Sequence, residues 1–159
     1  MTTLFEQIAQ RAKQLEHETA EFLMDMVRVP SFSGTEKDVI LVIKAEMEKV
    51  GFDEVIIDGL GNVIGRIGNG PRIIAFDAHI DTVYAGDMSL WDFDPFTPKI
   101  EDGKVWGRGT VDQEGGMASM VTAGKIIKEM GLNDQFTIYF TGTVMEEDCD
   151  GLCWKYIIN

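Results

Sequence analysis

Two apolar runs constrain the fold of this 159-residue chain more than any other feature. The first is RIIAFDA at residues 72–78, and the second is QFTIYFTGT at residues 135–143. Continuous apolar runs bounded by turn residues are typical of strands that are buried on both faces of a parallel sheet. A helix predicted over residues 115–130, and closed by Gly131, lies between the two runs. This order of strand, helix and strand predicts an α/β fold with a mostly parallel central sheet.

The rest of the pattern completes a single domain, which is all that the chain length supports. Apolar periodicity predicts helices over residues 4–27 and 39–50, strands over residues 53–58 and 62–67, and a hairpin over residues 99–106. Ser33 and Glu36 have the spacing of a capping box for the second helix. The hairpin is expected to turn at Asp102-Gly103.

Composition excludes several classes of function. Acidic residues outnumber basic ones by 27 to 14, which gives a net charge of −13 and argues against nucleic acid or an anionic membrane as a partner. No run approaches the roughly 20 apolar residues of a membrane helix. The charged N-terminal segment lacks the apolar core of a signal peptide, so the cytoplasm is the expected compartment. There, Cys149 and Cys153 are expected to be free thiols.

Polar side chains that suit metal binding or acid–base chemistry occur at three places. His79 and Asp81 follow the first apolar run, Asp112 lies in a glycine-rich segment before the helix, and Glu146 and Glu147 follow the second run. Each place alone has an ordinary explanation: a buried histidine, a helix N-cap and a solvated acidic turn. Because ligands bind outside the carboxyl ends of parallel strands, we expect the three places to converge.

Together, the three places are far more specific than any one of them. One His, one Asp and one Glu form a mixed nitrogen and oxygen set that zinc accepts, as do cobalt and manganese. Asp81 lies where it can hold the second ring nitrogen of His79. A further Glu beside the metal-binding Glu would serve as a base on a metal-bound water.

At these residues the chain resembles the co-catalytic metallohydrolases that include acetylornithine deacetylase, succinyl-diaminopimelate desuccinylase, aminoacylase and glutamate carboxypeptidase. The resemblance runs from about Arg28 to Gly151, and three motifs carry it: HID at 79–81, GRG with Asp112 and GG over 107–116, and the Glu pair at 146–147. The stretches WDFDPF at 91–96 and GGMASM at 115–120 are similar to a bacterial branch of selenium-metabolism-linked hydrolases.

The resemblance implies a three-layer α/β sandwich of the zinc-peptidase type that hydrolyses the amide bond of an N-acyl amino acid or a short peptide through a metal-bound hydroxide. By that resemblance, His79 ligates the first metal and Asp81 orients the His79 ring. Asp112 bridges two metals, and Glu147 ligates the second. Glu146 is the general base and then the general acid to the leaving amine. The implied cofactors are two divalent ions, zinc by preference and otherwise cobalt or manganese.

The resemblance further implies a cis peptide bond at Asp112-Gln113 and full-length relatives that are often homodimers. The chain departs from the family pattern at Glu114, where many relatives have lysine. The family also takes two further metal ligands, and a lid domain, from downstream segments. We therefore expect residues 1–159 to be the N-terminal part of a catalytic domain, without the lid or dimerisation domain and the C-terminal part. Such a truncated chain is expected to be weakly active or inactive.

Two alternatives stay open on the sequence alone. The chain could be an inactive remnant that still binds divalent metal, which makes it a binding module rather than an enzyme. It could also be a flavodoxin-like or nucleotide-binding α/β domain, although it has no phosphate loop of the form G-x-x-x-x-G-K-[ST]. The sequence does not identify the acyl group or side chain of a substrate.

Overall fold

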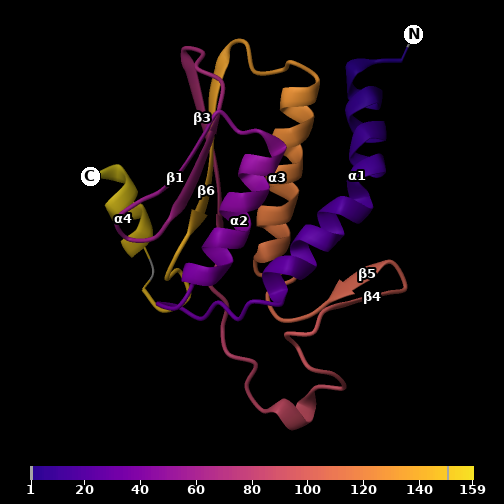
Figure 1. The fold of residues 1–159 in the computed structure, drawn as a ribbon, viewed down its shortest axis with the longest axis vertical. Helices are drawn as coiled ribbons and strands as arrows, with labels where there is room; N and C mark the ends of the chain where they lie inside the picture. The colour runs from indigo at the N-terminus through magenta and orange to yellow at the C-terminus, as the bar shows by residue number, and fades with distance from the viewer. Residues whose placement is uncertain (1, 150) are drawn as a thin grey trace.

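The computed structural model describes residues 2–149 and 151–159. The elements follow one another as α1 (Leu4–Val27), α2 (Lys37–Val50), β1 (Glu54–Ile57), β2 (Val63–Ile67), β3 (Arg72–His79), the 3₁₀ helix η1 (Met88–Leu90), β4 (Lys99–Glu101), β5 (Lys104–Trp106), α3 (Glu114–Glu129), β6 (Phe136–Thr143) and α4 (Leu152–Ile158) (Figure 1). The predicted helices and strands are all present, with bounds within about two residues of those expected. The α/β class is therefore confirmed.

The main sheet has the strand order β1-β2-β6-β3, and β4 and β5 form a separate hairpin. β3 and β6 are parallel, whereas the β1–β2 and β2–β6 pairs are antiparallel. The described sheet is thus mixed rather than mostly parallel as predicted. A parallel pair needs a long crossover, which α3 supplies between β3 and β6, whereas the short turn between β1 and β2 can only return the chain antiparallel.

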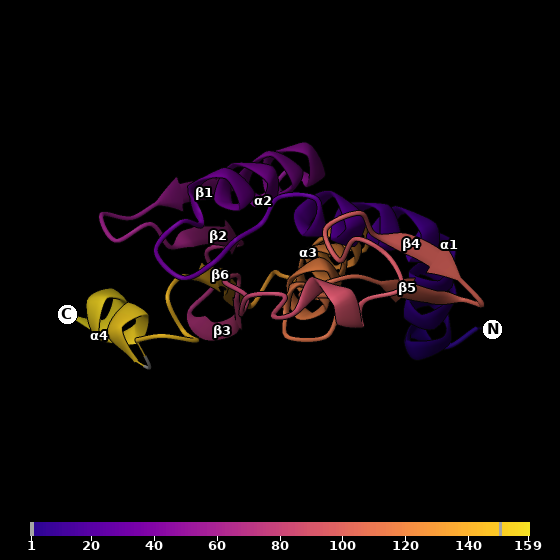
Figure 2. The same ribbon diagram turned by 90° about the horizontal axis from the view of Figure 1, so that it is seen from below.

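Helices α1, α2 and α3 lie on one side of the sheet, and the short α4 lies on the other (Figure 2). The hydrophobic core fills the space between these three helices and the sheet. Its fully buried members include Met26, Ile43, Val63, Met117 and Phe140. Burial of each such side chain contributes about 1.5–3 kcal/mol. Of the two helical layers expected in a three-layer sandwich, the described residues form one in full and one only through α4.

β3 is an edge strand, and its burial differs from the prediction. Ile73 is 72% exposed and Phe76 is 45% exposed, and only the last two residues, Ala78 and His79, are buried. The prediction that this run is buried on both faces was wrong for the described chain. The physical reason is that β3 lies at the edge of the sheet and that, among the described helices, only the short α4 lies on one side of the sheet, so little covers the side chains of β3.

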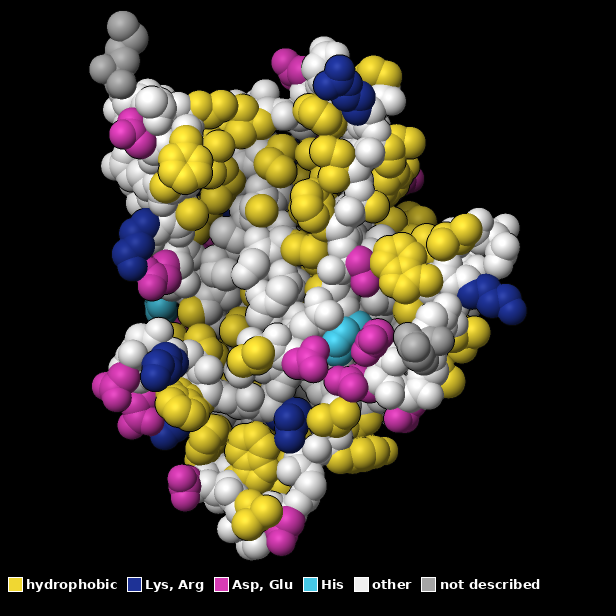
Figure 3. All heavy atoms as spheres, turned by 180° about the vertical axis from the view of Figure 1, so that it is seen from behind, with side chains coloured by type: hydrophobic (Ala, Val, Ile, Leu, Met, Phe, Trp, Pro, Cys, Tyr) yellow, Lys and Arg dark blue, Asp and Glu magenta, His cyan; other side chains and the backbone are white. Residues whose placement is uncertain are grey.

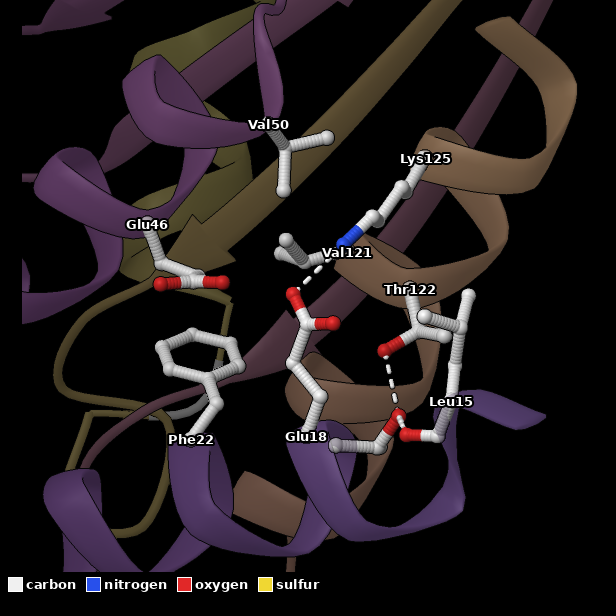
Figure 4. Close-up of a pocket in the computed structure, with 9 residues that line it drawn as sticks. Leu15, Glu18, Phe22, Glu46, Val50, Val121, Thr122 and Lys125 are labelled. Atoms are coloured by element: carbon white, nitrogen blue, oxygen red, sulfur yellow. Dashed lines mark hydrogen bonds and ion pairs between the residues drawn. The ribbon is translucent and has the colours of Figure 1, made fainter. Parts of the chain in front are cut away.

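Polar side chains join α1 to α3 beside the core. Figure 4 shows Lys125 of α3 pointing toward Glu18 of α1, and Lys125 Nζ lies 2.5 Å from Glu18 Oε1. The hydroxyls of Thr19 and Thr122 are 2.7 Å apart. The cavity beside them is about 10 Å³, which is room for one water at most. This junction between helices is therefore structural and is not a ligand site.

A capping box is present at a different helix from the one predicted. Thr3 and Glu6 form it at the start of α1. At α2 the N-cap residue is Glu36, without a side-chain cap, so the predicted box at Ser33 and Glu36 is absent. Ser33 instead donates its hydroxyl to Asp81 at 2.6 Å. Both side chains bond to residues near the carboxyl ends of β3 and β6, because charged or buried partners are available there.

The hairpin prediction is confirmed in its detail. Asp102 and Gly103 have φ angles of +52° and +73°, which is the left-handed conformation that a tight two-residue hairpin turn requires. Cys149 and Cys153 are both free, as expected. Among the described residues, no helix combines the length and apolar character needed to cross a bilayer.

Candidate metal centre

The five predicted site residues come from three segments that meet at one end of the sheet. His79 is the last residue of β3, and Asp81 follows it. Glu146 and Glu147 follow β6, which pairs with β3 in parallel up to His79 and Thr143. Asp112 lies just before α3, the crossover helix that connects these two strands. Figure 3 shows acidic side chains gathered around a histidine on one face of the molecule.

His79 is at the centre of this cluster. Ligating atoms of His79, Glu146 and Glu147 all lie within 4.8 Å of one another. His79 Nε2 lies 3.0 Å from Asp112 Oδ1 and 3.7 Å from Glu146 Oε2. The imidazole is nearly buried, whereas the Asp112 side chain is 74% exposed and that of Glu146 is 42% exposed. The ring nitrogen therefore faces a set of carboxylates that is open to solvent.

The other ring nitrogen of His79 is held by the residue two positions later. Nδ1 lies 2.9 Å from the backbone carbonyl of Asp81 and 3.5 Å from its carboxylate. A carbonyl can only accept a hydrogen bond, so Nδ1 carries the proton. In the neutral ring Nε2 is then the free ligand atom, on the side of the carboxylates. Asp81 thus orients His79 chiefly through its backbone, where the sequence suggested its side chain.

The carboxylate of Asp81 holds the Glu pair in place. Its two oxygens accept the backbone N–H groups of Glu146 and Glu147, each at 3.0 Å, together with the Ser33 hydroxyl. Asp81 is completely buried. This buried anion therefore ties the segment after β3 to the segment after β6.

Burial and hydrogen bonding act in opposite directions on the pKa values in the cluster. Burial alone would lower the pKa of His79, but its bonds to Asp81 and Asp112 raise it to about 9. Burial would raise the pKa of Asp81, but hydrogen bonds from His79, Ser33 and the backbone of the Glu pair lower it to about 2. Burial and the charge of Asp112 raise the pKa of Glu147. This excess of negative charge around one histidine is what a bound cation would compensate.

The ordinary explanation of Asp112 as a helix cap is not supported. The N-cap of α3 is Gln113, and no side chain caps this helix. The Asp112 carboxylate instead faces His79. The peptide bond between Asp112 and Gln113 is cis, as the family resemblance implied.

Three polar residues around the cluster were not predicted from the sequence. Asn62 is fully buried and its side-chain oxygen accepts the N–H of Val144. Glu36 accepts the N–H of Met145, and Ser33 bonds to Asp81. All three brace the segment that leads into Glu146. The capping-box spacing of Ser33 and Glu36 indicated other partners, and no local pattern could indicate the real ones, because these are backbone groups or residues about 50 to 110 positions away.

Glu114 is the residue at which the sequence departs from the pattern of many relatives. It begins α3 and is 1% exposed. Burial raises the pKa of its carboxyl to about 8. It is not among the residues whose contacts with His79 are described above.

Comparison with known proteins gives consistent matches. Residues 75–159 match peptidase family M20/M25/M40. The chain is 60% identical over 155 residues to the Escherichia coli K12 protein YgeY, covering 98% of this chain and 38% of YgeY. It is 33% identical over 135 residues to a probable succinyl-diaminopimelate desuccinylase of Staphylococcus epidermidis, covering 83% of this chain and 33% of that protein.

A solved structure supports the fold. Human carnosine dipeptidase 1 superposes with a TM-score of 0.82 at 18% identity, over 99% of this chain and 38% of that one. The chain thus spans between a third and two fifths of the length of these three proteins.

Proposed function

Because the chain belongs to peptidase family M20/M25/M40, we propose that the protein is a metal-dependent hydrolase that cleaves the amide bond of an N-acyl amino acid or a short peptide. The observation that carries this proposal is the convergence of His79 with Asp112, Glu146 and Glu147 at the ends of neighbouring strands. The activity is proposed for a full-length protein, because the relative YgeY is more than twice as long as this chain.

We assign His79, Asp112 and Glu147 as the residues that would hold two divalent ions: His79 would bind the first, Glu147 the second, and Asp112 both. The donor chemistry supports this assignment, since an imidazole whose Nε2 faces a group of carboxylates is a set that zinc accepts once that nitrogen has released its proton. Cobalt and manganese accept the same set. When bound, such ions polarise a substrate carbonyl and lower the pKa of water.

Glu146 is the proposed general base and acid. Its carboxylate is partly exposed and lies beside His79, while its backbone N–H is fixed by Asp81. In that position it takes a proton from the attacking water and then delivers it to the nitrogen of the leaving amine. Proton transfer of this kind contributes about 10²–10⁴-fold to the rate.

A second candidate is metal binding without turnover by the 159-residue chain alone. With this assignment, the described residues supply two ligands to each ion. The first ion would have His79 and Asp112, and the second would have Asp112 and Glu147. A four-coordinate catalytic site commonly has three protein ligands, so each ion is one short. We expect weak metal binding and poor turnover from this chain in isolation.

The test is turnover of N-acetyl amino acids and dipeptides by the full-length protein with zinc, cobalt or manganese. We expect Glu146→Gln to bind metal as the wild type does but to lose about 10²–10⁴-fold in kcat, and His79→Ala to lose the metal. Glu101→Gln, a change at an exposed acid of the β4–β5 hairpin, is the matched control and should alter neither. Turnover that survives complete metal removal, or that is unchanged in Glu146→Gln, would contradict the proposal.

A further inference from the structure

Three buried polar side chains in the segments that form the metal centre have no hydrogen-bond partner in the described part of the chain. They are Ser31, Thr82 and Glu114, which we call the buried polar cluster, and they are 1%, 3% and 1% exposed. Ser31 Oγ, Thr82 Oγ1 and Glu114 Oε2 each lack a partner. Leaving a buried polar group unpaired costs about 1–3 kcal/mol, so their grouping calls for an explanation.

Contacts with Gly109 place Thr82 and Glu114 together. A Cβ added at Gly109 would lie 2.7 Å from Glu114 Oε2 and 2.7 Å from a methyl carbon of Thr82. The N–H of Glu114 donates to the carbonyl of Gly109 at 3.0 Å, and the N–H of Thr82 donates to the carbonyl of Ser31 at 2.8 Å. Ser31 is thus joined through its backbone carbonyl to Thr82, which lies beside Gly109 together with Glu114. The cluster therefore joins three segments that are distant in sequence.

Each of these segments also carries a residue of the metal centre. Ser31 lies two positions before Ser33, which bonds to Asp81. Thr82 directly follows Asp81. Glu114 lies two positions after Asp112, which faces His79. The buried polar cluster thus lies in the same three segments that form this part of the metal centre.

Resting on the proposed function, we propose that Glu114 is a positioning residue for the metal centre. Its carboxyl, which lies against Gly109 and beside Thr82, holds the 107–113 segment against the end of β3. That contact sets the separation of Asp112 from His79, which must be fixed if Asp112 is to serve two ions. The polar end indicates a role beyond filling space, because a buried carboxyl oxygen without a partner is costly to keep against Gly109 and Thr82.

The alternative is that Glu114 serves only to fill space. The two roles differ in what a side chain of similar volume does. Glu114→Gln keeps the shape and the polar end, whereas Glu114→Met keeps the volume and removes the polar group. Val121→Ala, in the same helix and equally buried, is the control for a loss of stability unrelated to the centre.

The experiment measures Co²⁺ affinity from the visible absorption of the bound ion, together with amide hydrogen exchange over residues 107–113 in the metal-free, full-length protein. We expect Glu114→Gln to stay within about threefold of the wild-type affinity, and Glu114→Met to bind Co²⁺ about 10–100-fold more weakly. Exchange over residues 107–113 should rise in Glu114→Met and not in Val121→Ala.

Wild-type affinity and exchange in a folded Glu114→Met would overturn the inference. So would an equal loss of affinity in Val121→Ala. The proposed function fails separately, if the wild type takes up no Co²⁺ that His79→Ala removes. In that case hydrogen exchange over residues 107–113 still decides whether Glu114 positions the segment.

Discussion

Asp81, which lies just after the end of β3, bonds to several residues of the candidate site and its surroundings. Its backbone carbonyl fixes the tautomer of His79, and its carboxylate accepts two backbone N–H groups and one hydroxyl from other segments. Hydrogen bonds to a buried charge are worth about 1.5–3 kcal/mol each, so this side chain couples stability to the geometry of the site. A single residue thus positions both the histidine and the Glu pair.

We predict that Asp81→Asn destabilises the protein by about 2–3 kcal/mol, because the amide presents an N–H₂ group to a backbone N–H donor. Metal affinity should fall about 10–100-fold in the same variant, since the outer partners of a ligand hold its orientation. Urea denaturation and Zn²⁺ titration measure the two effects. Asp87→Asn is the control, because Asp87 also accepts a backbone N–H but lies in the exposed loop before η1. Asp81→Asn with the urea midpoint of the wild type would contradict this account.

At the scale of elements, one ion pair joins the end of α3 to the β1–β2 layer. Lys128 Nζ lies 2.5 Å from Asp53 Oδ1, and the N–H of Gly68 donates to the other oxygen of Asp53 at 2.6 Å. The bond from Lys128, and then that from Gly68, lower the pKa of Asp53 below its ordinary value of 3.8. Because the folded pKa is the lower one, the stabilisation is present above about pH 4 and is lost as the pH falls through the folded pKa.

We therefore predict that Asp53→Asn reduces stability at pH 7 and that the difference from the wild type disappears in acid. The Asp53 side chain is 37% exposed, so screening by solvent limits the effect to about 1 kcal/mol or less. Urea denaturation between about pH 7 and pH 3 measures it. Lys128→Gln and the double variant complete a mutant cycle, and purely additive effects would show that the pair is not coupled.

The elements also show what local sequence can and cannot predict. Periodicity located α1 and α3 closely, and the Asp102-Gly103 turn followed from the φ angles that a hairpin demands. The same reasoning was wrong for Ser33. Its spacing predicted a helix cap, but its hydroxyl donates instead to a buried carboxylate 48 residues away. The exposure of β3 could not be predicted either, because an apolar run specifies a strand but not what lies beside it.

The candidate site was predictable for a different reason. His79, Asp112 and Glu147 each follow or precede an element whose place in a strand, helix and strand unit fixes the end at which it terminates. Convergence thus follows from topology. The supporting contacts of Asn62, Glu36 and Glu114 depend on packing between segments, which no single-segment pattern encodes.

At the scale of the whole molecule, two opposing features govern how copies of this chain meet. The outer edge of β3 is unpaired among the described residues, and Ile73 beside it is 72% exposed. Such an edge is a template for pairing with another strand. The net charge of −13 repels a second copy, but that repulsion is screened by salt.

We predict that the 159-residue chain self-associates through β3 at tens of micromolar, and that association strengthens from about 0.05 to 0.5 M salt. Ile73→Lys should shift the chain toward monomer, because an edge lysine places a charge where a second strand would pair, while its exposed site leaves stability within about 0.5 kcal/mol. Sedimentation velocity measures the distribution of species. Leu90→Lys, which adds the same charge at an 82% exposed residue of η1, is the matched control. If both lysine variants dissociate the chain equally, charge alone is responsible. If the wild type stays monomeric at every salt concentration, the edge of β3 does not mediate self-association.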